Sequence, residues 1–274
     1  MDLNDVRKQK ARLEVFIVTS WIILFVAFIF AITRTFIWVA GILFIIAGIG
    51  LWYGQTRFKR LSTSFKDSYV KKMLEEILPD CTYDPKQGID KEVVYDSKIL
   101  HKEDRYHSED LLTGNLLGKH FTSADVHLQD VRSNGKTTTV VTVFQGRFFM
   151  IDSNKKYEQE VYIMPNHTYL FARGEDLKKI DMEYIDFNQH FDVFSRDKLA
   201  TFALLKPRFM EKLVEFSNQN RKVMFGFRNE TIFVAIDSRK DTFDIKVLHE
   251  INESFFDEIK NEINLVEELL SLLP

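Results

Sequence analysis

Two long apolar runs lie near the start of the chain, at residues 15–32 and 36–53, separated only by Thr33-Arg34-Thr35. Each run has 18 residues, close to the roughly 20 that a helix needs to cross a bilayer. One helix over both runs would be about twice as long as the hydrocarbon core is thick. The pattern therefore predicts a transmembrane helical hairpin at residues 13–54, with Arg34 at its turn.

Small residues recur in both runs: Gly41, Gly48 and Gly50 in the second, Ala27 and Ala31 in the first. Small side chains let membrane helices approach each other closely. We expect them to pack the two spans together, which is favoured over a specific oligomerisation face.

Lys and Arg are concentrated outside the two runs. Four of them precede the first run, Arg57, Lys59 and Arg60 follow the second, and only Arg34 lies at the turn. Such residues favour the cytoplasmic side of a membrane, so both termini, residues 1–12 included, are predicted to be cytoplasmic and the protein to reside in the cell membrane. Arg57, Lys59 and Arg60 are expected to contact anionic lipid headgroups.

A signal peptide is the alternative for the first run. Its apolar stretch is longer than usual for such a peptide, no A-x-A-like cleavage site follows, and a second apolar run comes at once. These features favour a membrane span.

Apolar positions recur at every third or fourth residue from Phe58 to Ile77, with Lys and Arg between them. The spacing predicts a juxtamembrane helix at 55–79, continuous with the second span and ended by Pro79. Its basic start would lie against lipid headgroups, while its second half could equally pack on the following domain.

Alternating β-branched and polar residues predict antiparallel strands at 122–132 and 137–151. They are joined at Asn134-Gly135, the dipeptide preferred in a type I′ turn. A third strand at 158–165 would complete a meander.

The remaining chain alternates between strand and helix patterns. We expect a strand at 182–195, a helix at 197–218 interrupted at Pro207, a second hairpin from 222–227 and 231–237, a strand at 243–248 and an amphipathic helix at 251–272. The apolar face of that last helix should dock on the domain. The fold class is therefore α+β: a two-helix transmembrane hairpin, then a cytoplasmic domain at 80–274 with an antiparallel sheet and flanking helices.

The net charge differs between the part of the chain that contains the two apolar runs and the part that follows it. Residues 1–60 carry a net charge of +5, whereas residues 61–274 carry −8. An acidic domain lacks the clustered Lys and Arg that nucleic acid binding requires, so we expect no nucleic acid partner. Cys81 is the single cysteine, which excludes an intramolecular disulfide and fits a reducing compartment.

Three segments, "GKHFTSADVHLQDVR", "TVFQGRFFMID" and "FDVFSRDKLATFALLKPRFMEKLVEF", follow the two-span hairpin. With the F-x-G-x-F pattern at Phe144, Gly146 and Phe148, they resemble a family of bacterial membrane proteins known as domain of unknown function 3137 (DUF3137). The resemblance covers most of residues 10–250. It implies a bacterial membrane-anchored α+β domain and assigns no activity or functional residue.

Two groups of polar residues invite a metal site. His120, Asp125 and His127 lie close in sequence, but on a strand His120 points away from the other two. Solvent-facing positions on a sheet are the favoured interpretation.

The second group, His101, Asp104, His107 and Asp110, is spaced by three, which would suit one helix face. Its polar neighbours instead favour an exposed segment. We predict no metal site in either group.

Catalytic motifs are not found. The sequence has no G-x-S-x-G, S-x-x-K or H-E-x-x-H element, and "LLTGNLLGKHF" lacks the glycine spacing of a phosphate-binding loop. Cys81 has no neighbouring histidine to activate it. We therefore predict no catalytic residue and no cofactor.

The leading hypothesis is a membrane-anchored cytoplasmic module with a scaffold or regulatory role, whose partners are the lipid bilayer, anionic headgroups and an unidentified protein. The alternative is a membrane-associated enzyme whose site would be assembled from residues distant in sequence. A cleft in which several histidines and carboxylates meet would favour the enzyme.

Overall fold

The computed structural model divides the chain into two compact units. One unit comprises Met1–Met73 with Phe243–Glu253, and the other comprises Leu74–Thr242 with Ser254–Pro274. The structure describes residues 3–34, 36–166, 177–218, 222–239, 243, 245, 247–251 and 254–274, with the backbone alone at 254–256, 258 and 259.

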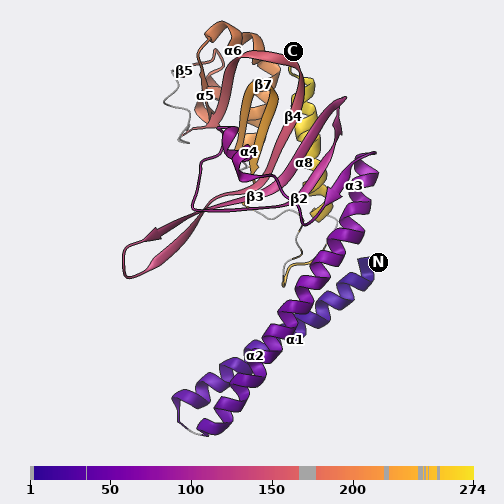
Figure 1. Ribbon diagram of the computed structural model, residues 1–274, viewed down its shortest axis with the longest axis vertical. Helices are drawn as coiled ribbons and strands as arrows, with labels where there is room; N and C mark the ends of the chain where they lie inside the picture. The colour runs from indigo at the N-terminus through magenta and orange to yellow at the C-terminus, as the bar shows by residue number, and fades with distance from the viewer. Residues whose placement is uncertain are drawn as a thin grey trace. The chain divides into compact units, whose positions relative to one another are not determined.

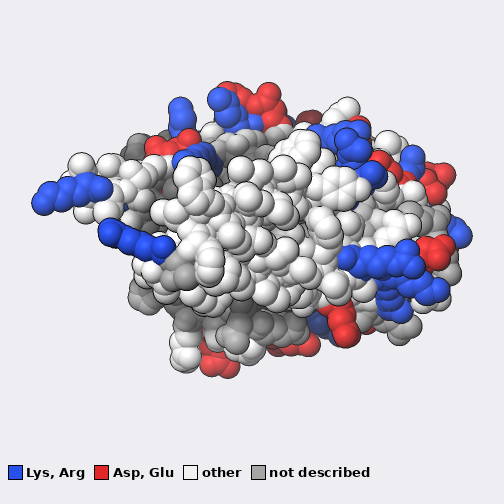
Figure 2. Space-filling view, turned by 90° about the horizontal axis from the view of Figure 1, so that it is seen from below, with Lys and Arg blue, Asp and Glu red and all other residues white. Residues whose placement is uncertain are grey.

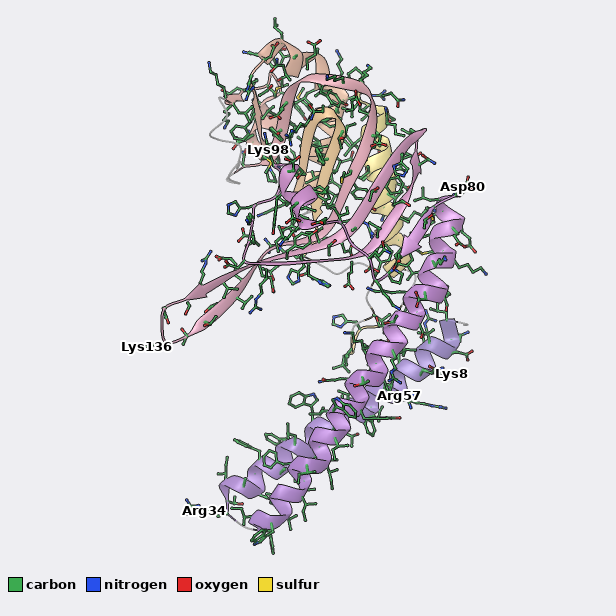
Figure 3. All side chains as sticks on the ribbon, in the orientation of Figure 1. Lys8, Arg34, Arg57, Asp80, Lys98 and Lys136 are labelled. Atoms are coloured by element: carbon green, nitrogen blue, oxygen red, sulfur yellow. The ribbon has the colours of Figure 1, made fainter. Side chains whose placement is uncertain are left out.

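The first unit is built on a helical hairpin, α1 (Leu3–Ile32) and α2 (Ile37–Phe65) (Figure 1). Both are long and apolar enough to cross a membrane, and only 17% of each apolar window is buried. Arg34 lies at the turn between the helices (Figure 3) with a positive φ of 53°. The prediction of two long apolar helices joined at Arg34 is confirmed.

Close packing of α1 on α2 depends on two glycines. A Cβ atom on Gly50 would lie 2.6 Å from Ser20 Oγ, and one on Gly54 would lie 2.8 Å from Ile17 Cγ1. Gly41 and Gly48, which we also expected at this interface, have nothing within 4 Å. They face away because α2 turns by about 100° per residue, which places positions 41 and 48 on a different side from 50 and 54.

The predicted juxtamembrane helix is confirmed as a continuation of α2. A single π-helical turn, η1 (Lys66–Val70), joins α2 to α3 (Lys71–Ile77). Phe58, Leu61 and Phe65 are buried along its apolar side.

A segment from far along the chain completes the first unit. The backbone N–H of Leu248 donates to Glu14 Oε1 at 2.6 Å, and Glu14 also pairs with Lys10. Phe243, Ile245 and Ile251 are buried. The described residues among 243–248 form a bend and a turn, so the strand predicted there is wrong at those positions. The apolar residues Phe243 and Ile245, which gave the sequence a strand-like pattern, are buried there.

The second unit contains an antiparallel sheet. Within the described residues its order is β1-β2-β3-β4-β6-β5, and β7 also pairs with β4. The strands are β1 (Thr82–Asp84), β2 (Arg105–Leu116), β3 (Lys119–Ser133), β4 (Thr138–Pro165), β5 (Lys178–Ile180), β6 (Phe191–Ser195) and β7 (Lys222–Asp237). The predicted α+β class with an antiparallel sheet is confirmed.

The strands predicted around Asn134-Gly135 are confirmed as the β3–β4 hairpin, which extends from the sheet as an arm with Lys136 at its tip (Figure 3). The predicted turn type is wrong. Of the two residues only Gly135 has a positive φ, 82°, whereas a type I′ turn needs two in succession. The Asn134 side chain instead accepts from the backbone N–H groups of Lys136 and Thr137.

Strand β4 is 28 residues long and takes in the third strand predicted at 158–165. It therefore continues where the sequence predicted a meander turn. The second predicted hairpin is also wrong, because β7 runs unbroken through Arg228-Asn229-Glu230 and pairs with β4 on both sides of it. The register changes between Asp152 and Val161, where β4 carries extra polar residues. Asn229, with φ of 51°, marks this bulge and not a turn.

Gly146 of the F-x-G-x-F pattern has a steric role. A Cβ atom there would lie 2.0 Å from the carbonyl oxygen of Ile236, so a side chain would prevent β7 from pairing with β4. Phe144 and Phe148, two residues to either side, are buried in the core.

Helices cover both faces of the sheet. On one face, α4 (Lys91–Asp96) and its flanking residues add Ile89, Val94, Ile99 and Leu100 to the core. On the other lie α7 (Pro207–Ser217) and α8 (Ser254–Ser271) (Figure 1). Phe209 of α7 contacts Phe225 and Phe227 of β7, at ring centroid distances of 5.6 and 6.5 Å.

The helix predicted at 197–218 is confirmed, with its interruption. It forms α6 (Lys198–Leu204), capped by the Asp197 carboxylate, and α7, which begins at Pro207. The strand predicted at 182–195 is correct only for β6, because α5 (Ile185–His190) precedes it. The Asn188 side chain bonds to the backbone N–H and carbonyl of Met182 and so stabilises the compact turn.

The C-terminal helix α8 buries Ile263, Val266, Leu269 and Leu270, and Lys212 of α7 pairs with its Glu268 at 3.0 Å. It packs within the second unit, as the sequence predicted. Glu262 of the same helix is only 2% exposed.

Candidate functional site

The hairpin helices bring together basic residues that are distant in sequence. α1 and α2 run antiparallel, and the close contacts at Ser20–Gly50 and Ile17–Gly54 set their register. Further along in the same direction, Arg12 of α1 comes opposite Arg57 and Arg60 of α2. The three arginines line one groove of about 550 Å³.

The rest of the groove lining is neutral. Gln9 and Ser64 offer hydrogen-bonding groups, and Leu13, Leu61 and Tyr53 offer apolar surface. None of the eight lining residues that the structure describes is acidic. Arg57 and Arg60 were predicted to contact lipid headgroups, and the structure adds Arg12 to them. Lys59, predicted with them, is exposed and does not line the groove.

Aromatic rings hold one of the arginines. The guanidinium carbon of Arg57 lies 5.2 Å from the centre of the Tyr53 ring, which itself packs edge-on against Phe16 at 5.9 Å. A cation over an aromatic face is attracted by the ring quadrupole. The contact fixes Arg57 while leaving its N–H groups available to a ligand.

The groove has a strongly positive electrostatic character. Within the described part of the chain, no carboxylate lies within 4 Å of the guanidinium groups of Arg12, Arg57 and Arg60. An Arg fork matches the oxygens of a phosphate or carboxylate, to which it can donate two parallel hydrogen bonds. This arrangement can bind an anionic group.

The three residues of the first sequence candidate group do not come together. His120 lies 3.6 Å from Asp152 on the surface, whereas His127 bonds to Thr142 at 3.1 Å. Burial, and then the nearby His107, lower the pKa of His127. Asp125 turns instead toward Arg147.

The second group is dispersed as well. His101 contacts Glu103 and His107 contacts Glu109, at 3.0 and 3.7 Å, and Asp104 accepts from the backbone N–H of Val131 at 2.8 Å. Asp110 is fully buried. Among the residues that the structure describes, no three His, Cys, Asp or Glu side chains are grouped as metal ligands.

A buried polar network in the sheet has no counterpart in the sequence prediction. Arg147 pairs with Asp125 at 3.2 Å and donates to Ser123 Oγ and to the Asp110 carbonyl. Tyr83 donates to the Asp110 carboxylate at 2.5 Å. Burial, reinforced by Asp110, raises the pKa of Tyr83 far above its usual value.

This network is closed to solvent, since the side chains of Arg147 and Asp125 are 2% and 10% exposed. A substrate would have no access to these groups. Asp125 and Arg147 are direct cross-strand partners, a relationship that depends on strand register and so was missed in the sequence. The network therefore joins β1, β2, β3 and β4.

The sequence and the structure were compared with those of known proteins. No curated protein matches the sequence. The crystal structure of the mycobacterial trehalose monomycolate transport factor A, TtfA, is 11% identical with a TM-score of 0.40, and the alignment covers 76% of this chain and 97% of that one. A TM-score this low does not establish that the two proteins share a fold.

A family model described as "Protein of unknown function (DUF3137)" matches residues 142–274. That range includes two of the three segments on which the family resemblance was based, together with the F-x-G-x-F pattern. Over residues 142–274 the chain matches this family model, and the resemblance is confirmed there.

Proposed function

We propose that this protein is a two-span membrane protein with both termini in the cytoplasm, which holds its α+β domain at the membrane as a scaffold or regulatory module. The observation that carries this proposal is the exposed apolar surface of the hairpin. Large side chains such as Trp21, Phe25, Trp38 and Trp52 are between 55% and 86% exposed. A wide uncharged area is seen in the space-filling view (Figure 2). Surface of this kind is stable against lipid and not against water.

Basic residues support the orientation. Arg34 lies at the turn of the hairpin, and Lys8 and Arg57 lie toward its other end (Figure 3). From Ile37 to Arg57, at about 1.5 Å per residue, α2 spans roughly 30 Å, which matches a hydrocarbon core of about 30 Å. The end with more Lys and Arg is the cytoplasmic one by the positive-inside rule.

The second unit supports a module over an enzyme. Its candidate histidines and carboxylates contact separate neighbours, and its most connected charged group, the network around Arg147, is buried. These arrangements stabilise a domain that presents its surface to a partner.

Cysteine labelling in intact cells tests the topology. In a Cys81→Ser background, a membrane-impermeant maleimide should label Arg34→Cys from outside, and Lys136→Cys only after the membrane is permeabilised. Both sites are exposed. Labelling of position 136 in intact cells would overturn the orientation, and release of the protein by alkaline carbonate would overturn the membrane anchor.

A further inference from the structure

We propose that the groove formed by Arg12, Arg57 and Arg60 is a specific binding site for one lipid whose headgroup carries two phosphates, of the diphosphatidylglycerol (cardiolipin) class. The inference rests on the proposed function, since such a lipid reaches the groove only if the hairpin is in a bilayer. It goes further by assigning a defined ligand and by adding Arg12, which belongs to the other helix.

The groove lies at the end of the apolar runs, at the level expected for the lipid headgroups. It begins at Tyr53, the last residue of the second apolar run, beside the exposed Trp52. Tyr and Trp are enriched where the hydrocarbon meets the headgroups. A phosphate at this level lies against the arginines, while its acyl chains continue along the exposed apolar side chains of α1 and α2.

The lining distinguishes this groove from a diffuse basic surface. Three arginines from two helices line one groove, and no described carboxylate pairs with them. Lys8, Lys59 and Lys72 are equally basic and exposed but do not line it. Diffuse attraction would use all of these charges, whereas a site uses the three that line the groove.

Charge and size favour two phosphates. One phosphodiester carries a single negative charge and would leave two of the three arginines that line the groove without an anionic partner. Two phosphates offset most of the positive charge and accept several Arg hydrogen bonds at once. A volume of about 550 Å³ is ordinary for a small-molecule site, and basic pockets between membrane helices are known to take such headgroups.

Native mass spectrometry of the full-length protein in detergent micelles tests the site. Cardiolipin, phosphatidylglycerol or phosphatidylcholine is titrated in, and the bound lipid is counted. Three proteins are compared: the wild type, the groove variant Arg12→Gln/Arg57→Gln/Arg60→Gln, and a control with the same loss of charge, Lys8→Gln/Lys59→Gln/Lys72→Gln.

We expect the wild type to bind one cardiolipin at least about tenfold more tightly than phosphatidylglycerol. The groove variant should lose at least about tenfold in cardiolipin affinity, the control less than about threefold. Replacing the same three arginines with Lys should restore part of the affinity, because the charge returns without the planar fork.

Three results would overturn the proposal. In the first, the groove variant binds cardiolipin like the wild type. In the second, both triple variants lose affinity equally, as a diffuse surface would. In the third, soluble pyrophosphate competes as strongly as the lipid, which would make the groove a site for free phosphate compounds.

Carbonate extraction and labelling of Arg34→Cys are repeated for each variant. If the anchor and topology persist while lipid selectivity is absent, the lipid site is wrong and the proposed function stands. If the wild type itself is extracted, the proposed function has failed first.

Discussion

The Nε atom of Arg7, near the start of α1, donates a hydrogen bond at 2.9 Å to the backbone carbonyl of Ile251, 244 positions further along the chain. Together with the Leu248–Glu14 hydrogen bond, it holds residues 247–251 against the start of the hairpin. The first unit thus depends on a segment that follows nearly all of the second unit in sequence.

Loss of the Arg7 side chain should loosen that segment. We expect Arg7→Gln to raise amide hydrogen exchange at 247–251 by about tenfold to a hundredfold, because a hydrogen bond from a charged donor contributes roughly 1.5–3 kcal/mol. Exchange in β3 and β4 should not change. Lys8→Gln, at an exposed neighbouring position, is the control; equal exchange in both variants would contradict the role of Arg7.

Gly50 and Gly48 form a matched pair for helix packing. Gly50→Val should lower the thermal stability of the hairpin, since a Cβ atom there meets Ser20 Oγ at 2.6 Å, whereas Gly48→Val meets open space. Both substitutions carry the same helix propensity. We expect overpacking at position 50 to cost about 1–3 kcal/mol.

Disulfide cross-linking between α1 and α2 measures how each glycine substitution affects the packing of the two helices. A cysteine pair placed in α1 and α2, in the Cys81→Ser background, should form a disulfide less readily in the Gly50→Val protein alone. Equal cross-linking in the two glycine variants would show that the helices meet elsewhere.

The Arg147–Asp125 pair should show strong coupling. Arg147→Met leaves Asp125 buried without its cation, which typically costs about 3–5 kcal/mol. The double variant Arg147→Met/Asp125→Leu removes the charge as well and should be more stable than Arg147→Met alone. Urea denaturation followed by circular dichroism measures the free energy of unfolding of the double variant and of each single variant. If the loss in the double variant equals the sum of the losses in the two single variants, the two residues are not coupled.

His127 should make the second unit sensitive to mild acid. Burial lowers its pKa in the folded state, while the unfolded value is about 6.5. The unfolded chain therefore binds the proton more readily, and stability is lost as the pH falls below about 6.5 toward the folded-state pKa.

The comparison is between His127→Gln and the exposed His120→Gln. His127→Gln should reduce the loss of thermal stability between about pH 7.5 and about pH 5.5, and His120→Gln should leave it as in the wild type. The same acid loss in all three proteins would assign the sensitivity to other groups.

The elements predicted best are those fixed by local physical constraints. The two apolar runs were predicted to be two helices because their combined length is about twice what one bilayer span needs, and Asp197 and Pro207 marked the starts of α6 and α7. Around Asn134-Gly135, the alternating pattern gave the strands correctly. The turn geometry differed because the Asn134 side chain caps the loop.

The failures concern partners distant in sequence. Arg228-Asn229-Glu230 has the composition of a turn, and a bulge has the same local pattern; only the pairing with β4 distinguishes them. Arg57 and Arg60 were found from the positive-inside rule, yet Arg12 could join them only once the Ser20–Gly50 contact set the helix register. The pairing of Asp125 with Arg147 was likewise invisible before the strand register was known.

The length of β4 sets the order in which the sheet can form. Its first half pairs with β3, which the ribosome has already made. Its second half pairs with β6 and β7, which follow it in sequence, and β7 also pairs with part of the first half. Until synthesis passes Asp237, the strand's second half therefore has open hydrogen-bonding edges, which tend to associate with other chains. Folding of this domain is thus a late event, and we expect chaperone dependence to fall sharply once β7 has left the ribosome.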